Sequence, residues 1–410
     1  MKELVYQRVL LPAAAQMADR PSVLDTCHEA TLGEHTDRSL RLASALRDQL
    51  GVQRGDRFAV MSLNGHRFLE LYHAGFLGGA VVNPLNLRLA PKELTFILQD
   101  SGTTVAFVDA TFAPLIDAVR DDAGLKQVVL LGPGDVPHDA GYEDLLAAGE
   151  ASVPEEPAED DPAILMYTGG TTGLPKGVVL EQRALVLDQY KLAMVWGMDE
   201  SVVYLHQTPM FHAASLGAIL AVPCGGGVTT SVPSFEPSAV LDVIEQRSVT
   251  MTVMVPTMIG MMLAHPAFSP ERLASLTTLT YGASPMPAAL LAQLQQLFPD
   301  LDLYQGYGMT ENAGLLTALR PDDHRRGGEI LRSAGRAVPG SVVTIQDPEG
   351  TILPAGETAR CAPGPATSCG STGTAPTRRP RRSATAGTTR ATPVAWTPTA
   401  TCTSSTGSRT

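Results

Sequence analysis

YTGGTTGLPKG, residues 167–177, carries more information than any other segment of this chain, because four glycines, three threonines and a lysine lie between two short apolar runs. Glycines allow backbone N–H groups to approach a polyphosphate closely, and threonine hydroxyls add further donors. Lys176 brings a positive charge that can meet the outer phosphates. The spacing GxxxxGK[ST] is absent, so the segment is not a Walker A loop. The pattern predicts a phosphate-binding loop, and an ordinary glycine-rich turn between two strands is the alternative.

Outward from this loop, apolar segments of two kinds alternate along the chain. Leu42, Ala45 and Leu46 recur at helical spacing within residues 37–50, which predicts an amphipathic helix with a charged outer face. Short continuous apolar runs have the length of buried strands. We expect strands over residues 57–63, 105–108, 128–131, 249–255 and 276–281, and a further helix over residues 287–297. Helices that alternate with buried strands predict an α/β fold with largely parallel sheets.

Three further segments contain residue types suited to contact with a nucleotide or a substrate. YGASPMP, residues 281–287, has three consecutive small residues, which would let a flat base lie against the backbone. YQGYGMTE, residues 304–311, ends in a hydroxyl beside a carboxylate, and Mg²⁺ binds one or two carboxylates together with phosphate oxygens. PMFHAAS, residues 209–215, contains a histidine next to a phenylalanine.

In this order the segments resemble the motifs of the adenylate-forming superfamily, and especially those of its acyl-CoA synthetases. The glycine-rich loop resembles the signature loop, with Gly170 where serine is usual, and some fatty-acyl-CoA synthetases share that glycine. The later segments resemble the adenine-side turn, the tyrosine–threonine–glutamate motif and the segment whose histidine lines the acyl entrance. Further landmarks are VPTM (residues 255–258), GRAVPG (residues 335–340) and LGGAVVNPLNLRLAPKEL (residues 77–94), so the resemblance covers roughly residues 30–357.

The resemblance implies roles for individual residues. Tyr307 would stack on adenine, Thr310 would meet the α-phosphate, and Glu311 would be the Mg²⁺ ligand. The implied catalytic residues are Lys176, His212, Thr310 and Glu311, of which His212 would line the acyl entrance. The residues implied to bind ATP are Thr168, Gly169, Gly170, Thr171, Thr172, Gly173, Lys176, Gly282, Ala283, Ser284, Tyr307, Gly308 and Thr310.

The resemblance also implies a fold and a reaction. Two mostly parallel sheets flanked by helices, in αβαβα layers, would be followed by a small β-barrel subdomain and then by a C-terminal lid domain. The substrate carboxylate would attack the α-phosphorus of ATP in line and expel pyrophosphate, and CoA would then take the acyl group as a thioester. The protein would act mainly by positioning the reactants and neutralising charge. ATP, Mg²⁺ and CoA are therefore expected, together with a carboxylic acid of fatty-acid type.

Plainer interpretations stay open for two of these residues and for the function. A lone histidine beside Phe211 is often a core residue whose hydrogen bonds are satisfied. Independently, Glu311 could be an ordinary solvated acid at the start of a helix. The nine histidines show no metal-ligand spacing, and the five cysteines form no CxxC or zinc spacing. The alternatives are an enzyme that loads a carrier protein instead of CoA, and a non-catalytic binder of nucleotide or acyl groups.

Composition narrows the class of partner. The chain has 410 residues, 44% of them hydrophobic and 18% charged, which is enough to bury a large core and form two or more lobes. A net charge of -12 argues against a nucleic-acid partner. Arg8 and Pro12 interrupt the first apolar stretch, and no run of about 18 apolar residues occurs, so we expect neither a signal peptide nor a transmembrane segment. We expect a cytoplasmic protein, with peripheral membrane contact and oligomeric state left open.

The end of the sequence departs from the rest. After Gly340, SVVTIQDPEGTILPAGE predicts a strand, a turn at residues 348–350 and a second short strand, the beginning of a β subdomain. Residues 358–410 contain no Leu, Ile, Met, Phe, Asp, Glu or Lys, so they cannot form a packed core. The expected division is residues 1–332 for the ATP- and acyl-binding lobes, 333–357 for the beginning of the β subdomain, and 358–410 for an aberrant, disordered tail.

A frameshift would account for this tail. In a reading frame shifted by one base, each new codon takes its last two bases from the first two bases of a codon here, so only its first base is free. In that frame TSCGSTGTAP (residues 367–376) can be read as NVMREYWNRP, and TAGTTRAT (residues 385–392) as DGWYHSGD. TATCTSSTGSRT (residues 399–410) can be read as DGYLYVVDRVKD, and all three strings resemble superfamily sequence in the right order. We therefore predict a frameshift near Thr358, with the C-terminal lid domain absent, and a natural disordered extension is the alternative. Thr392 would replace the ribose-binding Asp, so nucleotide binding and thioester formation would be impaired; resequencing the gene tests this.

Overall fold

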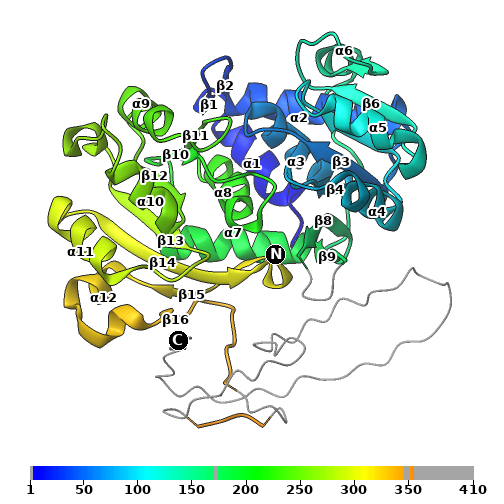
Figure 1. Ribbon diagram of the computed structural model, residues 1–410. Coiled ribbons are helices and arrows are strands. Elements are labelled where there is room, and N and C mark those ends of the chain that lie inside the picture. Colours follow the sequence, from blue (N-terminus) through cyan, green and yellow to red (C-terminus); the bar gives the residue numbers. More distant parts are fainter. Residues whose placement is uncertain (1–2, 170–173, 346–350, 355–410) are drawn as a thin grey trace.

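The computed structural model describes residues 3–169, 174–345 and 351–354 of the chain, and in these residues it forms two β-sheets (Figure 1). The larger sheet has nine strands, with parallel pairing at its centre and antiparallel pairs at both ends. In spatial order the strands are β16 (Arg336–Ala337), β15 (Gly314–Leu319), β14 (Asp302–Met309), β13 (Thr278–Gly282), β12 (Met251–Met254), β10 (Val203–His206), β11 (Val228–Ser231), β1 (Pro21–Leu24) and β2 (Glu29–Thr31).

The smaller sheet has seven strands, all parallel except for the antiparallel pair β8–β9 at one edge. Parallel neighbours require crossover connections, and the chain supplies helices for most of them. In spatial order the strands are β7 (Ala140–Gly141), β6 (Gln127–Leu130), β5 (Val105–Val108), β3 (Arg57–Met61), β4 (Val81–Pro84), β8 (Pro162–Thr168) and β9 (Lys176–Glu181).

Helices cover the outer faces of both sheets and fill the space between them (Figure 1). The central layer contains α1 (Gln7–Gln16), α2 (Leu32–Asp48), α3 (His66–Gly78), α7 (Gln182–Trp196) and α8 (Ala213–Cys224). The helices beside the smaller sheet are α4 (Pro91–Ser101), α5 (Ala113–Ala123) and α6 (Tyr142–Ala148). Those beside the larger sheet are α9 (Pro237–Arg247), α10 (Pro256–Leu263), α11 (Ala288–Leu297) and α12 (Pro321–Arg326), with 3₁₀ turns η1 (Pro270–Leu273), η2 (Thr310–Asn312) and η3 (Gly328–Arg332).

The start of α2 shows how local sequence fixes an element. The Thr31 hydroxyl accepts from the Glu34 N–H at 3.2 Å, and the Glu34 carboxylate accepts from the Thr31 N–H at 2.8 Å. This reciprocal capping box satisfies donors that a helix start leaves free. Leu42 and Leu46 then fall on the face that packs into the central core, and both are buried. The helix therefore begins five residues before the position that apolar spacing alone predicts.

The predicted α/β fold with two mostly parallel sheets is confirmed. The strand expected over residues 105–108 is β5, with all four residues buried, and the helix expected over residues 287–297 is α11 within one residue. The strand expected over residues 249–255 is shorter, because β12 is confined to Met251–Met254. Continuous apolar runs identify buried strands well, although their ends are set by neighbouring strands that the pattern does not contain.

The segment after β16 bears only partly on the predicted β subdomain. The Leu353 N–H donates to the Ile345 carbonyl at 2.8 Å, so the two sides of the expected turn are joined by a backbone hydrogen bond. The turn itself, at residues 348–350, and the predicted tail, at residues 358–410, lie outside the described residues. The division between lobes and subdomain after residue 332 stays a prediction.

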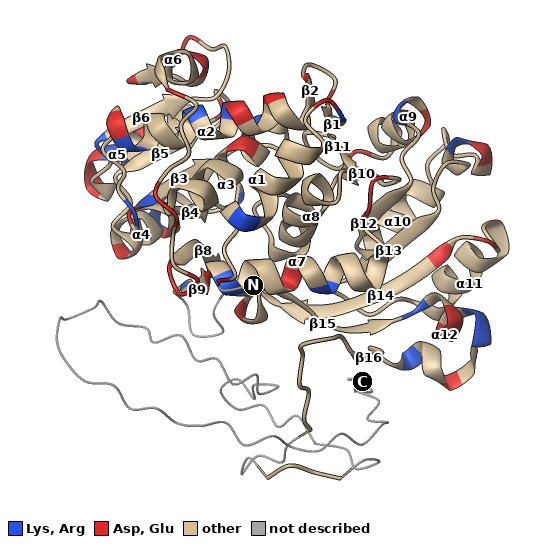
Figure 2. Cartoon of the chain, turned by 180° about the vertical axis from the view of Figure 1, so that it is seen from behind, with Lys and Arg blue, Asp and Glu red and all other residues tan. Residues whose placement is uncertain are grey.

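Charged residues occur mainly in the outer helices and connecting loops, whereas the strands of both sheets contain few of them (Figure 2). This distribution is expected of strands covered on both faces by helices. Among the helices that the structure describes, none has both the length and the apolar character needed to cross a bilayer.

Candidate functional site

A cavity of about 400 Å³ opens between α7, α8 and the carboxyl ends of β12, β13 and β14. The carboxyl ends of parallel strands are where open α/β sheets bind ligands. Six of the predicted site residues line this cavity, although they come from three separate segments of the sequence: His212, Gly282, Ala283, Tyr307, Gly308 and Thr310. The fold therefore brings these motifs together in one place.

The turn that follows β13 presents backbone to the cavity. Gly282 and Gly306 are partners in the β13–β14 ladder, and a Cβ on Gly282 would lie 2.3 Å from the Gly306 carbonyl oxygen. Ala283 follows with a φ of 63°, in the left-handed region that residues with a Cβ seldom adopt. Ser284 is exposed and lies outside the cavity lining. The turn is suited to a flat ring, because its two cavity-lining residues, Gly282 and Ala283, carry no side chain larger than a methyl group.

A buried histidine anchors the end of β13. The Tyr281 hydroxyl lies 2.8 Å from His324 Nε2, and His324 Nδ1 lies 2.9 Å from the Arg320 carbonyl oxygen. The carbonyl can only accept, so Nδ1 carries the proton and Nε2 accepts from the hydroxyl. Burial lowers the pKa of His324, which favours this neutral form. The hydrogen bonds hold the start of the turn against α12.

The segment at the end of β14 lies beside this turn and also lines the cavity. The β14–β15 register shifts between Tyr307 and Gly308, and a Cβ on Gly308 would lie 1.8 Å from the Gly314 carbonyl oxygen. Tyr307 is half-buried, and Thr310 begins η2 at the cavity edge. Glu311 is exposed and lies outside the lining, and within the described part of the chain its carboxylate has no recorded hydrogen bond or ion pair.

The glycine-rich loop is carried by the β8–β9 hairpin. Thr168 and Lys176 are partners in this ladder, and the Thr168 hydroxyl lies 3.5 Å from the Lys176 carbonyl oxygen. Both Gly169 and Lys176 are exposed, and none of these three residues lines the cavity. β9 contacts η2, so the base of the loop lies beside the Thr310 turn although the two segments belong to different sheets. The centre of the loop lies outside the described residues: Gly170, Thr171, Thr172 and Gly173.

His212 is the N-cap residue of α8 and lines the mouth of the cavity. Its ring lies 4.5 Å from the Phe211 ring, measured between centroids. Desolvation lowers the pKa of His212, and the positive charge of Arg88 lowers it further. A neutral imidazole can donate one hydrogen bond and accept another. The residue is exposed, unlike a core histidine, and its predicted contact with the acyl group stays a prediction.

Sequence reasoning missed a polar group at the inner end of the cavity. Asp188 on α7 is 2% exposed and lines the cavity, and its Oδ1 accepts from the Leu315 N–H at 3.0 Å. Burial raises the pKa of Asp188 to about 7, against the opposing effects of that hydrogen bond and of Lys191. Trp196 and Thr280 line the same cavity and were missed as well.

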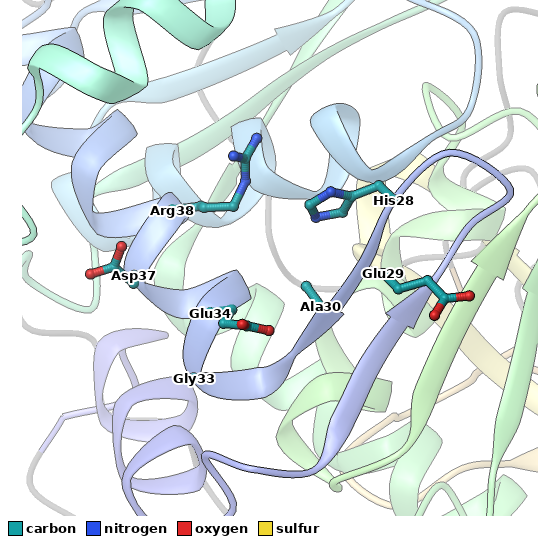
Figure 3. A pocket seen from close by; sticks show the side chains of 7 residues that line it. All are labelled: His28, Glu29, Ala30, Gly33, Glu34, Asp37 and Arg38. Carbon is teal, nitrogen blue, oxygen red and sulfur yellow. The ribbon is translucent and has the colours of Figure 1, made fainter.

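A second hollow, of about 440 Å³, lies at the β1–β2 turn and the start of α2 (Figure 3). Its lining residues are His28, Glu29, Ala30, Gly33, Glu34, Asp37 and Arg38. Beside it, ligand atoms of His28, His66 and Glu70 lie within 4.8 Å of one another, a grouping that could hold a metal ion. Histidine spacing did not indicate this group because His28 is far from the other two residues in the sequence.

The Glu70 carboxylate is already engaged without a metal. It accepts from Arg38 Nε at 2.7 Å and from the Tyr142 hydroxyl. His28 Nε2 lies 3.8 Å from Glu70 Oε1, beyond hydrogen-bond distance. A cation placed between them would lie next to the Arg38 guanidinium, and like charges repel. The group is accordingly better described as a buried ion-pair network than as a metal site.

Comparisons with known proteins agree with this geometry. Residues 11–362 match the AMP-binding enzyme family. Long-chain-fatty-acid–CoA ligase FadD13 of Mycobacterium tuberculosis is 33% identical over 316 residues, which cover 75% of this chain and 60% of that protein. Feruloyl-CoA synthase of Amycolatopsis is 36% identical over 329 residues, which cover 80% of this chain and 63% of that protein.

The solved structures include a similar fold of comparable extent. The inhibitor-bound N-terminal domain of FACL13 from Mycobacterium tuberculosis aligns with a TM-score of 0.77 and 28% identity, covering 85% of this chain and 86% of that chain. The chain spans 60% and 63% of the length of the two curated relatives.

Proposed function

The chain belongs to the family of AMP-binding enzymes, and on that premise we propose that it activates a carboxylic acid with ATP to give an acyl-adenylate and pyrophosphate. The proposal extends to a second step, in which CoA takes the acyl group as a thioester. A fatty acid is the proposed substrate class, in keeping with the name of the FadD13 relative. Loading of a carrier protein is the alternative second step, and the cytoplasmic location is part of the same proposal.

One observation carries the proposal. The cavity joins the adenine-side turn, the Tyr307 segment and His212, while β9 brings the base of the glycine-rich loop to η2. A nucleotide needs a flat surface for its base and donors for its phosphates, and an acid needs an adjoining apolar space. Those features lie next to one another here, which is the arrangement that adenylation requires.

The proposed roles follow from position. The base lies against the Gly282–Ala283 backbone beside the Tyr307 ring, and Thr310 meets the α-phosphate. Lys176, at the base of the loop, meets the outer phosphates together with backbone N–H groups. The acid enters past His212, and its carboxylate oxygen forms a bond to the α-phosphorus as the bond to pyrophosphate breaks. The protein lowers the barrier by holding both reactants in line.

Glu311 suits the Mg²⁺ ion that such a reaction uses. Its carboxylate is exposed next to Thr310, with no recorded partner among the described residues, so it is free to meet a metal–nucleotide complex. Mg²⁺ needs only one or two protein carboxylates, because water and phosphate oxygens complete its shell. When bound, the ion supplies neutralising charge for the phosphates.

Carboxylate-dependent exchange of labelled pyrophosphate into ATP tests the first step. We expect exchange with at least one member of a panel of fatty and aryl acids, and a fall of at least about 100-fold for Glu311→Gln, the range seen when a transition-state charge contact is removed. Glu329→Gln is the matched control, because Glu329 is also exposed and lies outside the cavity lining.

Calorimetric titration with ATP and Mg²⁺, run in parallel, separates the outcomes. Exchange that survives Glu311→Gln would remove the metal role while leaving the activity. Binding without exchange for any acid would favour a non-catalytic binder, and the absence of both would overturn the proposal.

A further inference from the structure

Asp188 leaves one carboxylate oxygen uncovered at the inner end of the cavity. Oδ1 accepts from the Leu315 N–H, whereas Oδ2 has no recorded donor within the described part of the chain. No Lys, Arg or His of that part forms an ion pair with it either. A buried carboxylate normally has a partner, because burying an unpaired charge costs several kcal/mol.

Two glycines keep this oxygen open to the cavity. A Cβ on Gly314 would lie 2.6 Å from Asp188 Oδ2, and a Cβ on Gly217 would lie 3.2 Å from it. Both glycines line the cavity. A side chain at either position would cover or displace the carboxylate, so the local sequence leaves room for a donor from outside the protein.

Two more polar groups in this cavity lack a partner. Trp196 Nε1 and Thr280 Oγ1 are buried atoms with no hydrogen bond among the described residues, and Thr280 is 2% exposed. Buried polar groups in native proteins are nearly always hydrogen-bonded, and each unmet one costs roughly 1–3 kcal/mol. Three such groups around one cavity indicate that a bound molecule supplies the missing partners.

Most of the remaining lining is apolar. Leu192 and Leu315 are buried, and Val253, Val255 and Met258 complete this side of the cavity. A mostly apolar pocket with a few converging polar groups is typical of a small-molecule site in which the polar groups set specificity.

Burial distinguishes the two ends of the cavity. Ala283 and His212 are exposed at the mouth, where the proposed chemistry takes place. Asp188 and Gly217 are buried at the inner end. An acid whose carboxylate lies at the mouth would therefore direct the far end of its acyl group toward Asp188.

We propose that Asp188 determines specificity, and that the preferred acid carries a hydrogen-bond donor, a hydroxyl or amino group, at the end of its acyl group remote from the carboxylate. Asp188 Oδ2 accepts this hydrogen bond, with Thr280 Oγ1 and Trp196 Nε1 as neighbours. This inference rests on the proposed adenylation reaction, and it narrows the substrate class from fatty acids in general to hydroxy or amino acids with an apolar middle.

The test uses three length series of straight-chain acids that end in a methyl, a hydroxyl or an amino group. Pyrophosphate exchange is measured at about pH 8.5, above the pKa of about 7 of Asp188, so that the carboxylate is ionised, for the full chain and for Asp188→Leu. At the matching length we expect the donor-bearing acid to exceed its methyl-terminated counterpart by about 10- to 100-fold in kcat/KM, the value of one hydrogen bond to a charged group. Asp188→Leu should remove or reverse this preference, whereas Asp188→Asn should keep the hydroxyl preference and lose most of the amino preference.

Matched variants separate specificity from folding. Asp117→Asn changes an exposed acid on α5, outside the cavity lining, and should leave every ratio unchanged. Thr280→Val keeps the shape of a strand residue while removing one hydroxyl, so it tests the neighbouring group in a protein that folds. A purely structural role for Asp188 would lower activity for all acids alike, whereas a specificity role changes the ratio between them.

Direct binding of the same acids, measured by calorimetry, distinguishes failure of the inference from failure of the proposed function. Tighter binding of donor-bearing acids that depends on Asp188, with no exchange, would support the inference and overturn the adenylation proposal. Exchange or binding that shows no preference for a donor at any length, in both the unaltered chain and Asp188→Leu, would overturn the inference.

Discussion

Lowering the pH from about 7.5 to about 5.5 will change the free energy of unfolding through three buried histidines. His73 Nε2 lies 3.0 Å from the Ile219 carbonyl oxygen, which can only accept, so Nε2 carries the proton. His73 Nδ1 then accepts from His35 Nε2 at 2.7 Å, and His35 Nδ1 stays unprotonated without a partner among the described residues. Both ring nitrogens of His206 are likewise buried and unpaired there. The hydrogen bonds and the burial thus both require neutral rings.

The size of the effect follows from the pKa values. Burial, the largest cause in each case, lowers the pKa of His35 and of His73 to about 3 and that of His206 to about 4. An unfolded histidine has a pKa of about 6.5, so below that pH the unfolded chain binds protons that the folded protein does not. Stability is therefore complete above about pH 6.5 and falls as the pH drops toward the folded pKa. At about pH 5.5 each histidine costs about 1.4 kcal/mol, or about 4 kcal/mol for three.

Asp188 acts in the opposite direction. Its pKa is raised to about 7, so between the unfolded value of about 4 and this pH the folded protein holds a proton that the unfolded chain releases. On lowering the pH to about 5.5 this contributes about 2 kcal/mol of added stability. The unaltered protein should thus lose about 2 kcal/mol through these four groups, whereas Asp188→Asn should lose the full 4 kcal/mol or so.

Urea unfolding followed by circular dichroism at the two pH values measures the difference between the variants. His206→Leu should reduce the pH-dependent loss by about 1.4 kcal/mol, because it removes one of the three groups. His138→Gln, at an exposed histidine, is the control and should leave the loss unchanged. Equal pH dependence in the unaltered chain, Asp188→Asn and His206→Leu would refute the reasoning, because the His206 ring and the Asp188 carboxyl would then each titrate alike in the folded and unfolded states.

Three further changes probe other features. Gly282→Ala should lower the free energy of unfolding, measured by urea denaturation, by about 1–3 kcal/mol, because the new methyl group would clash with the Gly306 carbonyl. An unchanged urea midpoint would show that β13 and β14 can move apart without cost. Lys176→Ala should weaken ATP binding by about 10-fold or more in calorimetric titration while leaving acid binding unchanged, and equal loss of both would contradict a phosphate role. Glu70→Gln should cost about 3 kcal/mol, measured by thermal unfolding, because it leaves the partly buried Arg38 without a carboxylate; an unaltered Tm would show that Glu143 can replace Glu70.

The sequence predicted those elements of the fold that are determined by the local pattern of apolar residues. Four consecutive apolar residues over 105–108 predicted β5, and helical spacing in residues 37–50 predicted most of α2. The start of α2 was misplaced, because the capping residues Thr31 and Glu34 carry no apolar signal. Strand order could not be derived from such patterns, since pairing depends on contacts between segments far apart in the chain.

The sequence predicted the motifs of the candidate site but not the polar residue buried within its cavity. Glycines and other small residues within 281–287 and 304–311 indicated the Gly282 turn and the Tyr307 segment, and both line the cavity. Asp188 was missed although a signal existed: it shares the buried face of α7 with Leu185 and Leu192, where a charged residue is unexpected. The buried histidine pair was missed because its members meet only after folding, with His35 from α2 and His73 from α3.

Because β9 contacts η2, a nucleotide bound at this contact would affect the cooperativity of thermal unfolding. One ligand held there would touch the last strand of the smaller sheet and the tip of the larger one. Ligands that bind only the native state oppose its loss in proportion to their concentration above Kd. ATP would therefore couple the unfolding of the part built on the smaller sheet to that of the part built on the larger sheet. At saturating nucleotide, scanning calorimetry should show both parts unfolding in one cooperative transition.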